Sequence, residues 1–369
     1  MSSSDDTTGE IKLALVIPTL NEAQNIHPLL DRLYLVLSAI SWEVLFVDDD
    51  STDGTREQIK ERASKDKRIR LIHRIGRKGL SSACLEGILA SNAPYVAVMD
   101  ADLQHDESIL PAMYDALVAG DHDLIVGSRY ADEGSLGNWQ GKRREASKLA
   151  TSLTRRLTRV QIQDPLSGFF MFRRSAMQPA LREASAIGFK LLLDLILSQP
   201  SKTRLLEIPY HFRTREAGDS KMSLAVAWEL LLLIADKRLG HVIPARFLSF
   251  AVIGSSGIAV HFAVLATFHR FLGGDFALAQ AIATLAAMTT NFWLNNITTF
   301  ADHRLRGRAW LKGWLSFAAV CSFGALANVG IASVLFENDL NWAASALAGV
   351  VVSAVWNYVV TASYIWHAK

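Results

Sequence analysis

Two acidic clusters in the first third of the chain contain the residue types that hold a metal ion. Residues 47–51 read VDDDS and residues 99–105 read MDADLQH. Asp100 and Asp102 are two positions apart, so both carboxylates can approach one hard cation, and the amide oxygen of Gln104 can add a further ligand. A metal ion at this point would neutralise a diphosphate leaving group. For either cluster taken alone, a solvated turn or a helix cap is the alternative.

The elements that position these clusters alternate along the first 130 residues. Strands are predicted at residues 11–18, 42–47, 69–73, 95–99 and 123–126, and helices at residues 21–40, 52–65, 79–91 and 108–119. This alternation predicts an α/β domain with a mostly parallel sheet. In such a sheet, ligands bind beyond the carboxyl ends of the strands, and both acidic clusters fall there.

The composition of the chain changes near residue 244, after which charges become rare. Four apolar stretches follow, at about residues 243–268, 276–300, 311–336 and 342–366. Each can cross a hydrocarbon core of ~30 Å at about 1.5 Å per residue. An amphipathic helix before them suits the membrane interface, with packing in a core as the alternative. We expect a catalytic domain at residues 1–221, interface helices at 222–242 and a four-helix membrane domain at 243–369.

Basic residues indicate which side of the membrane each part occupies. One cluster precedes the first apolar stretch and another follows the second: Lys237, Arg238 and Arg246, then Arg304, Arg306, Arg308 and Lys312. The positive-inside rule places both in the cytoplasm. Residues 1–10 have no signal-peptide pattern. We therefore expect a multi-pass integral protein of the cytoplasmic membrane with its catalytic domain in the cytoplasm.

Charge and cysteine content exclude other classes of site. The net charge of the 369-residue chain is +2, which offers no bulk attraction for nucleic acid. Cys84 and Cys321 are the only cysteines and lie far apart. They cannot build a disulfide framework or a zinc site.

Short motifs in a fixed order cover nearly the whole polar part of the chain. They are VIPTLNE at residues 16–22, VDDDS at 47–51, GLSSA at 79–83, MDADLQH at 99–105, GSRY at 127–130, DPLSGFF at 164–170, IGFK at 187–190 and REAGDSK at 215–221. In these motifs the chain resembles family 2 glycosyltransferases of the GT-A fold. More narrowly, it resembles the prokaryotic dolichol-phosphate mannose synthases with a fused transmembrane domain. The apolar part resembles a GtrA-like four-helix domain.

The resemblance implies a role for each matching position. The nucleotide base and ribose would lie against Pro18, Leu20, Glu22, Val47 and Asp49. Asp100 and Ala101 would contact the nucleotide and sugar, and Asp102 and Gln104 would hold Mg²⁺ or Mn²⁺. The acceptor phosphate would bind Arg129 and Arg143, with Ser147 nearby, and the donor diphosphate would bind Arg215 and Lys221. The expected catalytic residues are Asp100, Asp102 and Arg129.

Two positions depart from the family's pattern. Leu20 stands where tyrosine is common, which puts its role in the nucleotide site in doubt. Asp106 stands where proline is common, directly after the expected metal ligands.

The chemistry of the implied substrates agrees with these residues. A lipid phosphate is already an anionic nucleophile, so a dedicated general base is not required. The site instead needs cations that hold two anionic substrates together, and the planar guanidinium of arginine suits a phosphate. The resemblance thus implies metal-dependent, inverting transfer of mannose from GDP-mannose to a polyprenyl (dolichyl) phosphate. The product would be polyprenyl-phosphate β-mannose on the cytoplasmic face of the lipid bilayer.

Alternative functions stay open at this point. The same fold could use UDP-glucose or another nucleotide sugar, because base and hexose selectivity rest on few contacts. The apolar stretches alone would suit a lipid-linked sugar flippase, although their centres carry almost no charge. They could also anchor the chain or join it into a homo-oligomer. A non-catalytic nucleotide-binding regulator would be expected to lose charges such as Asp102, Arg129 and Arg215, which are present.

Overall fold

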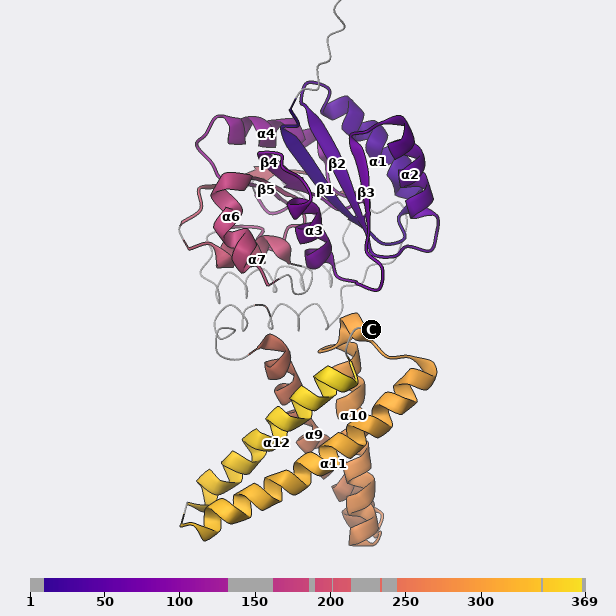
Figure 1. The fold of residues 1–369 in the computed structure, drawn as a ribbon, viewed down its shortest axis with the longest axis vertical. Coiled ribbons are helices and arrows are strands. Elements are labelled where there is room, and N and C mark those ends of the chain that lie inside the picture. The colour runs from indigo at the N-terminus through magenta and orange to yellow at the C-terminus, as the bar shows by residue number, and fades with distance from the viewer. Residues whose placement is uncertain are drawn as a thin grey trace, which may run out of the picture. The chain divides into compact units, whose positions relative to one another are not determined.

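A computed structural model describes residues 10–131, 162–185, 190–200, 202–213, 233, 244–339 and 341–366. The chain divides into two compact units, Met1–Lys237 and Arg238–Lys369 (Figure 1). Apart from Leu233, the interface region predicted at residues 222–242 lies outside the described residues.

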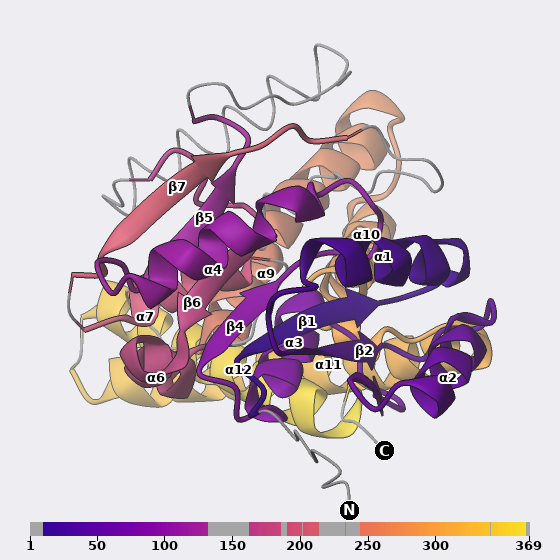
Figure 2. The ribbon, with the colours of Figure 1, turned by 90° about the horizontal axis from the view of Figure 1, so that it is seen from above.

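The described part of the first unit is built on a seven-stranded sheet of order β3-β2-β1-β4-β6-β5-β7 (Figure 2). The strands are β1 (Leu13–Thr19), β2 (Trp42–Asp48), β3 (Ile69–His73), β4 (Tyr95–Val98), β5 (Leu124–Ser128), β6 (Phe170–Arg173) and β7 (Leu205–Pro209). β1 pairs in parallel with β2 and β4, β2 with β3, and β5 with β7. β6 is antiparallel to both β4 and β5. The predicted mostly parallel α/β fold is confirmed.

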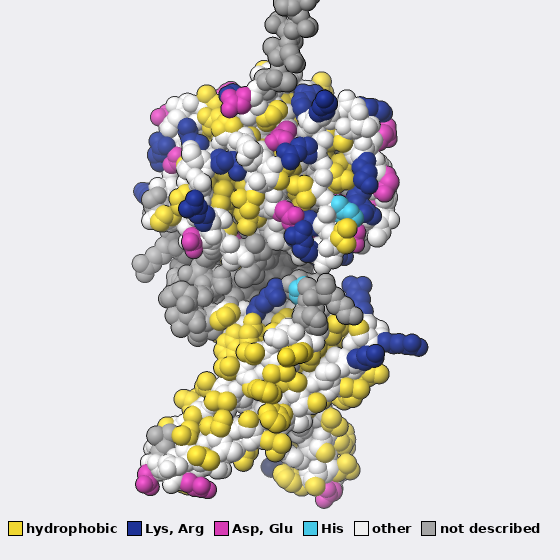
Figure 3. Space-filling view, in the orientation of Figure 1, with side chains coloured by type: hydrophobic (Ala, Val, Ile, Leu, Met, Phe, Trp, Pro, Cys, Tyr) yellow, Lys and Arg dark blue, Asp and Glu magenta, His cyan; other side chains and the backbone are white. Residues whose placement is uncertain are grey.

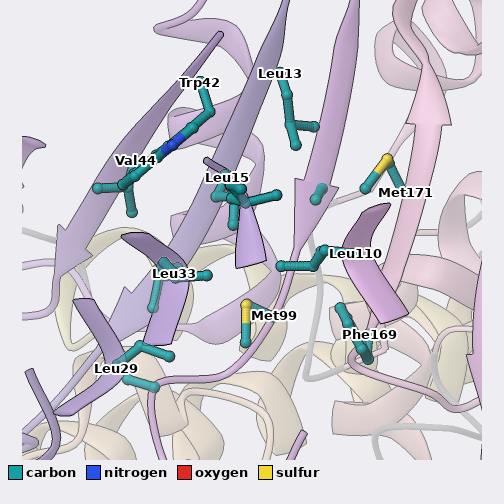
Figure 4. Close-up of a cluster of buried hydrophobic side chains, with 14 of the residues drawn as sticks. Leu13, Leu15, Leu29, Leu33, Trp42, Val44, Met99, Leu110, Phe169 and Met171 are labelled. Carbon is teal, nitrogen blue, oxygen red and sulfur yellow. The ribbon is translucent and has the colours of Figure 1, made fainter. Parts of the chain in front are cut away.

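Helices cover both faces of this sheet. They are α1 (Ala23–Val36), α2 (Thr55–Lys65), α3 (Leu80–Leu89), α4 (Leu110–Val118), α6 (Arg174–Glu183) and α7 (Leu191–Ser198). Leu13 and Leu15 of β1 pack with Leu29 and Leu33 of α1 in one buried cluster (Figure 4). Val16, the next residue along β1, belongs to a second cluster with α3, α6 and α7. Successive side chains of a strand point to opposite faces, so β1 is buried from both sides.

Two strands of the sheet, β6 and β7, were not predicted from the sequence. β6 has four residues and β7 five, and neither shows an apolar run as clear as that of β1. The short helices α6 and α7 were also missed. β6 lies between the predicted strands β4 and β5 and runs antiparallel to both, and β7 adds an edge strand beside β5.

The second unit contains four long helices among its described residues. They are α9 (Ala245–Leu265), α10 (Phe276–Ile297), α11 (Gly307–Glu337) and α12 (Trp342–Tyr364), and a short π-helix η2 (Ala266–Phe271) continues α9. α9 packs mainly against α10, and α11 against α12. Apolar side chains cover much of the visible surface of this unit (Figure 3).

Three described segments are long and apolar enough to cross a membrane: Arg246–Phe271, Gly307–Glu337 and Leu347–Tyr364. α10 lies in the remaining predicted stretch but carries Thr289, Thr290, Asn291, Asn295 and Asn296. That α10 also crosses the bilayer stays a prediction.

Asparagine amides lie against glycines where these helices pair. A Cβ built on Gly257 of α9 would come within 2.5 Å of the Asn291 amide in α10. A Cβ built on Gly324 of α11 would overlap the Asn357 amide in α12. Glycine therefore lets each helix backbone approach a polar side chain of its neighbour, as small residues do in membrane helix packing.

We predict that Gly324→Ala destabilises the second unit, because the added methyl group would overlap the Asn357 amide. Overpacking of this kind costs about 1–3 kcal/mol. Gly330→Ala in the same helix is the matched control, since nothing lies within 4 Å of the position that its Cβ would take. It should be neutral or stabilising by up to about 1 kcal/mol. Thermal unfolding in detergent compares the two, and equal shifts would contradict the assigned contact.

Candidate functional site

One edge of the sheet collects the loops that carry the predicted site. Strands β1, β2, β4, β5 and β7 run in the same direction, so their carboxyl ends share this edge. β6 runs the other way, so the segment that precedes it, residues 164–169, reaches the same edge. The antiparallel strand thus adds a loop that a purely parallel sheet would place elsewhere.

The loops after β1 and β2 form one connected wall. The backbone N–H of Asn21 donates to the hydroxyl of Ser51 at 2.9 Å, and that of Glu22 donates to the hydroxyl of Thr55 at 2.9 Å. The Asn21 side chain in turn accepts from the Thr52 N–H at 2.9 Å. These bonds fix the first predicted nucleotide loop to the second.

The predicted nucleotide residues lie along this wall. Pro18 and Val47 are direct neighbours in the β1–β2 ladder. Leu20 is 39% exposed, so its side chain is open to solvent at the loop surface. The carboxylate of Glu22 accepts a hydrogen bond from the Asn25 amide at 2.6 Å. The structure therefore brings all five predicted positions into one region, since the Asp49 N–H donates to the Thr19 carbonyl at 3.0 Å.

Asp49 is buried and connects β2 to the GLSSA segment. One carboxylate oxygen accepts from the guanidinium of Arg74, and the other accepts from the Gly79 N–H at 2.7 Å. Burial raises the pKa of the Asp49 carboxyl, and the Gly79 and Arg74 contacts only partly oppose this rise. Arg74 also donates to the Ser82 hydroxyl at 2.6 Å. Sequence reasoning missed this buried arginine, although it directly follows β3 at the same sheet edge.

Three non-glycine residues at this edge have a left-handed backbone. They are Asn21, Asp50 and Leu103, with φ of 59°, 65° and 61°. A left-handed residue with a side chain costs roughly 1–2 kcal/mol. Such residues cluster at functional sites, where the surrounding structure holds them. Each of the loops after β1, β2 and β4 contains one of them.

The loop after β4 places Asp102 and Gln104 on either side of Leu103. The Gln104 N–H donates to the Asp102 carboxylate at 3.1 Å. The side-chain amide nitrogen of Gln104 donates to the backbone carbonyl of Arg213 at 3.0 Å. Within the described residues, no group of three or more His, Cys, Asp or Glu side chains could hold a metal by itself. Two protein oxygens would suit Mg²⁺ or Mn²⁺, because such ions take most remaining ligands from substrate phosphates and water.

The buried ring of His105 contacts Asp100. Its ring is 3% exposed and stacks on Phe169, with ring centroids 5.1 Å apart. Its Nδ1 accepts from the backbone N–H of Asp100 at 3.2 Å. Burial lowers the pKa of His105 to about 4, so the ring is neutral at pH 7. A Cβ on Gly168 would lie 3.1 Å from the Asp100 carboxylate, so a glycine leaves room for that side chain.

Arg129 is held in a buried ion pair with Asp164. Its Nε and Nη2 donate to the two carboxylate oxygens at 2.7 and 2.8 Å, and its backbone N–H donates to the same carboxylate at 3.1 Å. Asp164 is fully buried. Although burial disfavours a charged guanidinium, the Asp164 contacts outweigh it and raise the Arg129 pKa. Arg129 thus keeps its charge in a fixed orientation.

The structure places most, but not all, of the predicted residues. Ala101 is buried between Asp100 and Asp102 in the loop after β4. Arg143, Ser147, Arg215 and Lys221 lie outside the described residues. Asp164, the first residue of the DPLSGFF motif, is the partner of Arg129.

Family models match both parts of the chain. "Glycosyl transferase family 2" matches residues 14–179, and "GtrA/DPMS, transmembrane domain" matches residues 249–366. Together with the apolar helices, the second match makes this a membrane protein.

Curated relatives extend the match to the whole chain. A dolichol-phosphate mannosyltransferase of Pyrococcus furiosus is 32% identical and covers 96% of this chain and 99% of that protein. The Saccharomyces cerevisiae dolichol-phosphate mannosyltransferase is 34% identical over 58% of this chain and 82% of its own length. A polyprenol monophosphomannose synthase of Mycolicibacterium smegmatis is 32% identical over 60% and 85%.

Among solved structures, glucosyl-3-phosphoglycerate synthase from Mycobacterium tuberculosis, in complex with Mn²⁺, UDP-glucose and phosphoglyceric acid, has a TM-score of 0.49. It is 18% identical and covers 62% of this chain and 79% of its own. This likeness is too distant to bear on the substrate. The full-length similarity to the Pyrococcus furiosus protein and the two family matches carry the assignment. The chain is a glycosyltransferase with a GT-A-like domain, and it belongs to the dolichol-phosphate mannosyltransferase family.

Proposed function

We propose that the protein transfers mannose from GDP-mannose to a polyprenyl or dolichyl phosphate and inverts the anomeric configuration. The names of its full-length and partial relatives support the reaction class. The observation that carries the proposal is the meeting, at one sheet edge, of the Asp102–Gln104 loop with the Arg129–Asp164 pair. Oxygen ligands for a cation and a fixed cation for an anion are what two phosphate-bearing substrates require.

The donor would occupy the wall formed by the loops after β1 and β2. Pro18, Leu20, Glu22, Val47 and Asp49 would cradle its base and ribose, and Asp100 and Ala101 would contact nucleotide and sugar. Arg215 and Lys221 would bind the diphosphate. Asp102 and Gln104 would hold Mg²⁺ or Mn²⁺, which when bound neutralises charge on the departing diphosphate.

The acceptor phosphate would bind Arg129, with Arg143 and Ser147 nearby. An oxygen of the lipid phosphate attacks the anomeric carbon from the face opposite the GDP, the new C–O bond forms, and the bond to the diphosphate breaks. The attacking phosphate oxygen already carries charge, so no proton must move. Asp164 contributes by holding the Arg129 guanidinium in one orientation, which reduces the rearrangement needed as substrates bind.

The second unit would keep this reaction at the membrane. Basic residues Arg304, Arg306 and Arg308 near the connector between α10 and α11 favour a cytoplasmic position for that connector. With α9 to α12 all crossing the bilayer, the catalytic domain would lie on the same side. The lipid-linked β-mannose would then form on the cytoplasmic face.

Transfer of label into lipid is the first test. The detergent-solubilised protein, polyprenyl phosphate and Mn²⁺ should convert labelled GDP-mannose into a lipid-extractable product. Labelled UDP-glucose in a parallel reaction tests the donor. Failure of both donors would refute the transferase proposal, and product from UDP-glucose alone would refute the donor assignment.

Replacing Asp102 tests the metal assignment within that assay. Asp102→Asn should lower kcat by roughly 10²-fold or more, because the charged ligand of a cation that stabilises the transition state is lost. Asp123→Asn is the control, since Asp123 pairs with exposed Arg204 before β5, at the opposite edge. Activity of Asp102→Asn equal to that of the control would exclude Asp102 as a ligand.

Arg129→Lys tests the acceptor side while retaining the charge. The ammonium group cannot reproduce the two-point contact with Asp164, so its position should be less fixed. We expect the KM for polyprenyl phosphate to rise about tenfold, with the KM for GDP-mannose within about twofold of normal. Arg204→Lys at the exposed ion pair controls for the substitution itself. A larger effect on the donor would assign Arg129 to the diphosphate instead.

A further inference from the structure

We propose that Arg213 is a positioning residue that holds the Gln104 amide toward the cation, in partnership with Asp106 and Glu107. The inference rests on the proposed metal site. Of the residues involved, Arg213 and Glu107 belong to none of the sequence motifs.

The backbone of Arg213 holds Gln104 at two points. The Arg213 N–H donates to the Gln104 carbonyl at 2.9 Å, and the Gln104 side-chain nitrogen donates to the Arg213 carbonyl at 3.0 Å. A carbonyl oxygen only accepts hydrogen bonds, so the amide nitrogen must face it. A flipped amide would place two acceptor oxygens against each other. The Gln104 Oε1 is therefore directed away from Arg213, and it is the atom that a cation would require.

The side chain of Arg213 fixes the next two residues of the same loop. Its Nη2 donates to the Asp106 carboxylate at 2.9 Å, and its Nη1 donates to the Glu107 carboxylate at 2.6 Å. Nη1 also lies 3.4 Å from the backbone carbonyl of His105. Arg213 consequently contacts every residue from Gln104 to Glu107, and movement of the loop would break several bonds together.

The two carboxylates are unequal partners. Glu107 is only 7% exposed at its side chain and also lies 4.0 Å from Arg32. Asp106 is 21% exposed and accepts from the Ser108 N–H at 3.1 Å, which caps the short helix η1 (Glu107–Ile109). Asp106 is the position at which this sequence departs from the proline common in the family. A proline has no carboxylate, so this part of the Arg213 contact depends on the residue found in this chain.

Partly exposed ion pairs such as that of Arg213 with Asp106 contribute little to global stability. Their effect here is geometric, because a ligand must stay within about 0.5 Å of its productive position. Supporting contacts around a metal ligand commonly alter affinity by roughly 10–100-fold when removed. Arg213 should therefore affect cation binding more than folding.

Direct Mn²⁺ binding tests the inference independently of turnover. With GDP present, the electron paramagnetic resonance signal of free Mn²⁺ reports the Kd of the full-length protein in detergent. Arg213→Gln should weaken Mn²⁺ binding about tenfold, and Asp106→Asn should shift it less in the same direction. Mannosyl transfer should then need about tenfold more Mn²⁺ for half-maximal rate, with kcat at saturating Mn²⁺ within about threefold of normal.

Arg204→Gln is the matched control. Arg204 precedes β7 as Arg213 follows it, and it pairs with Asp123 at 2.6 Å on the opposite sheet edge. The Mn²⁺ affinity of the Arg204→Gln variant should equal that of the unmodified protein. Normal Mn²⁺ affinity in both Arg213→Gln and Asp106→Asn, or equal losses in Arg213→Gln and Arg204→Gln, would overturn the inference. An unmodified protein that binds no Mn²⁺ would overturn the metal site and this inference together, whereas absence of lipid product with Mn²⁺ bound would refute only the transferase reaction.

Discussion

The buried pair of Arg129 and Asp164 is the interaction on which this part of the sheet edge depends. A fully buried carboxylate is unfavourable unless its lone pairs are satisfied, and Asp164 meets this condition with three hydrogen bonds from Arg129. The backbone N–H groups of Gln163 and Asp164 donate in turn to Glu207 of β7 at 2.7 and 3.0 Å. The end of β5, the segment before β6 and strand β7 are thereby joined. Because β6 is antiparallel, this connection also carries Gly168 and Phe169 to Asp100 and His105.

Two buried titratable groups at this sheet edge differ in charge: the His105 ring is neutral and the Arg129 guanidinium is charged. Burial keeps the His105 ring uncharged at pH 7, so it orders the Asp100 backbone without adding a cation of its own. The Arg129 guanidinium instead stays charged because its counter-ion is fixed beside it. A guanidinium held in this way stabilises an anion more than an uncharged sugar, because only the anion interacts favourably with a preorganised cation.

The sequence predicted the features that follow from neighbouring residues, namely the buried strands and the acidic loops that follow them. Continuous apolar runs predicted β1, β2 and β4, and the acidic residues after β2 and β4 located two loops of the candidate site, because buried strands and strand ends favour different residue types. β6 was missed because it runs directly into α6 at Arg174, so no turn residue marks where the strand ends. The contacts of Arg74 with Asp49, and of Arg213 with Asp106, join residues 25 and 107 positions apart. No periodicity encodes such pairings, which follow only once the strand order is known. For α10 the sequence predicted a membrane span from its length. Its threonine and asparagine residues depart from the apolar pattern of the other spans, and it is not among the described segments that are apolar enough to cross a membrane.

The contacts between glycine and asparagine in the second unit have a consequence for its design. In each helix pair a glycine of the first helix meets an asparagine of the second, Gly257 with Asn291 and Gly324 with Asn357, and the second pair adds the reverse contact of Gly349 with Asn328. The sequences around the glycines agree as well, since residues 247–251 read FLSFA and residues 314–318 read WLSFA. The two hairpins therefore share one glycine–asparagine contact in the same order along the chain. Among the described residues, the pairing of α11 with α12 is thus fixed at two such points along the helices, whereas the pairing of α9 with α10 is fixed at one.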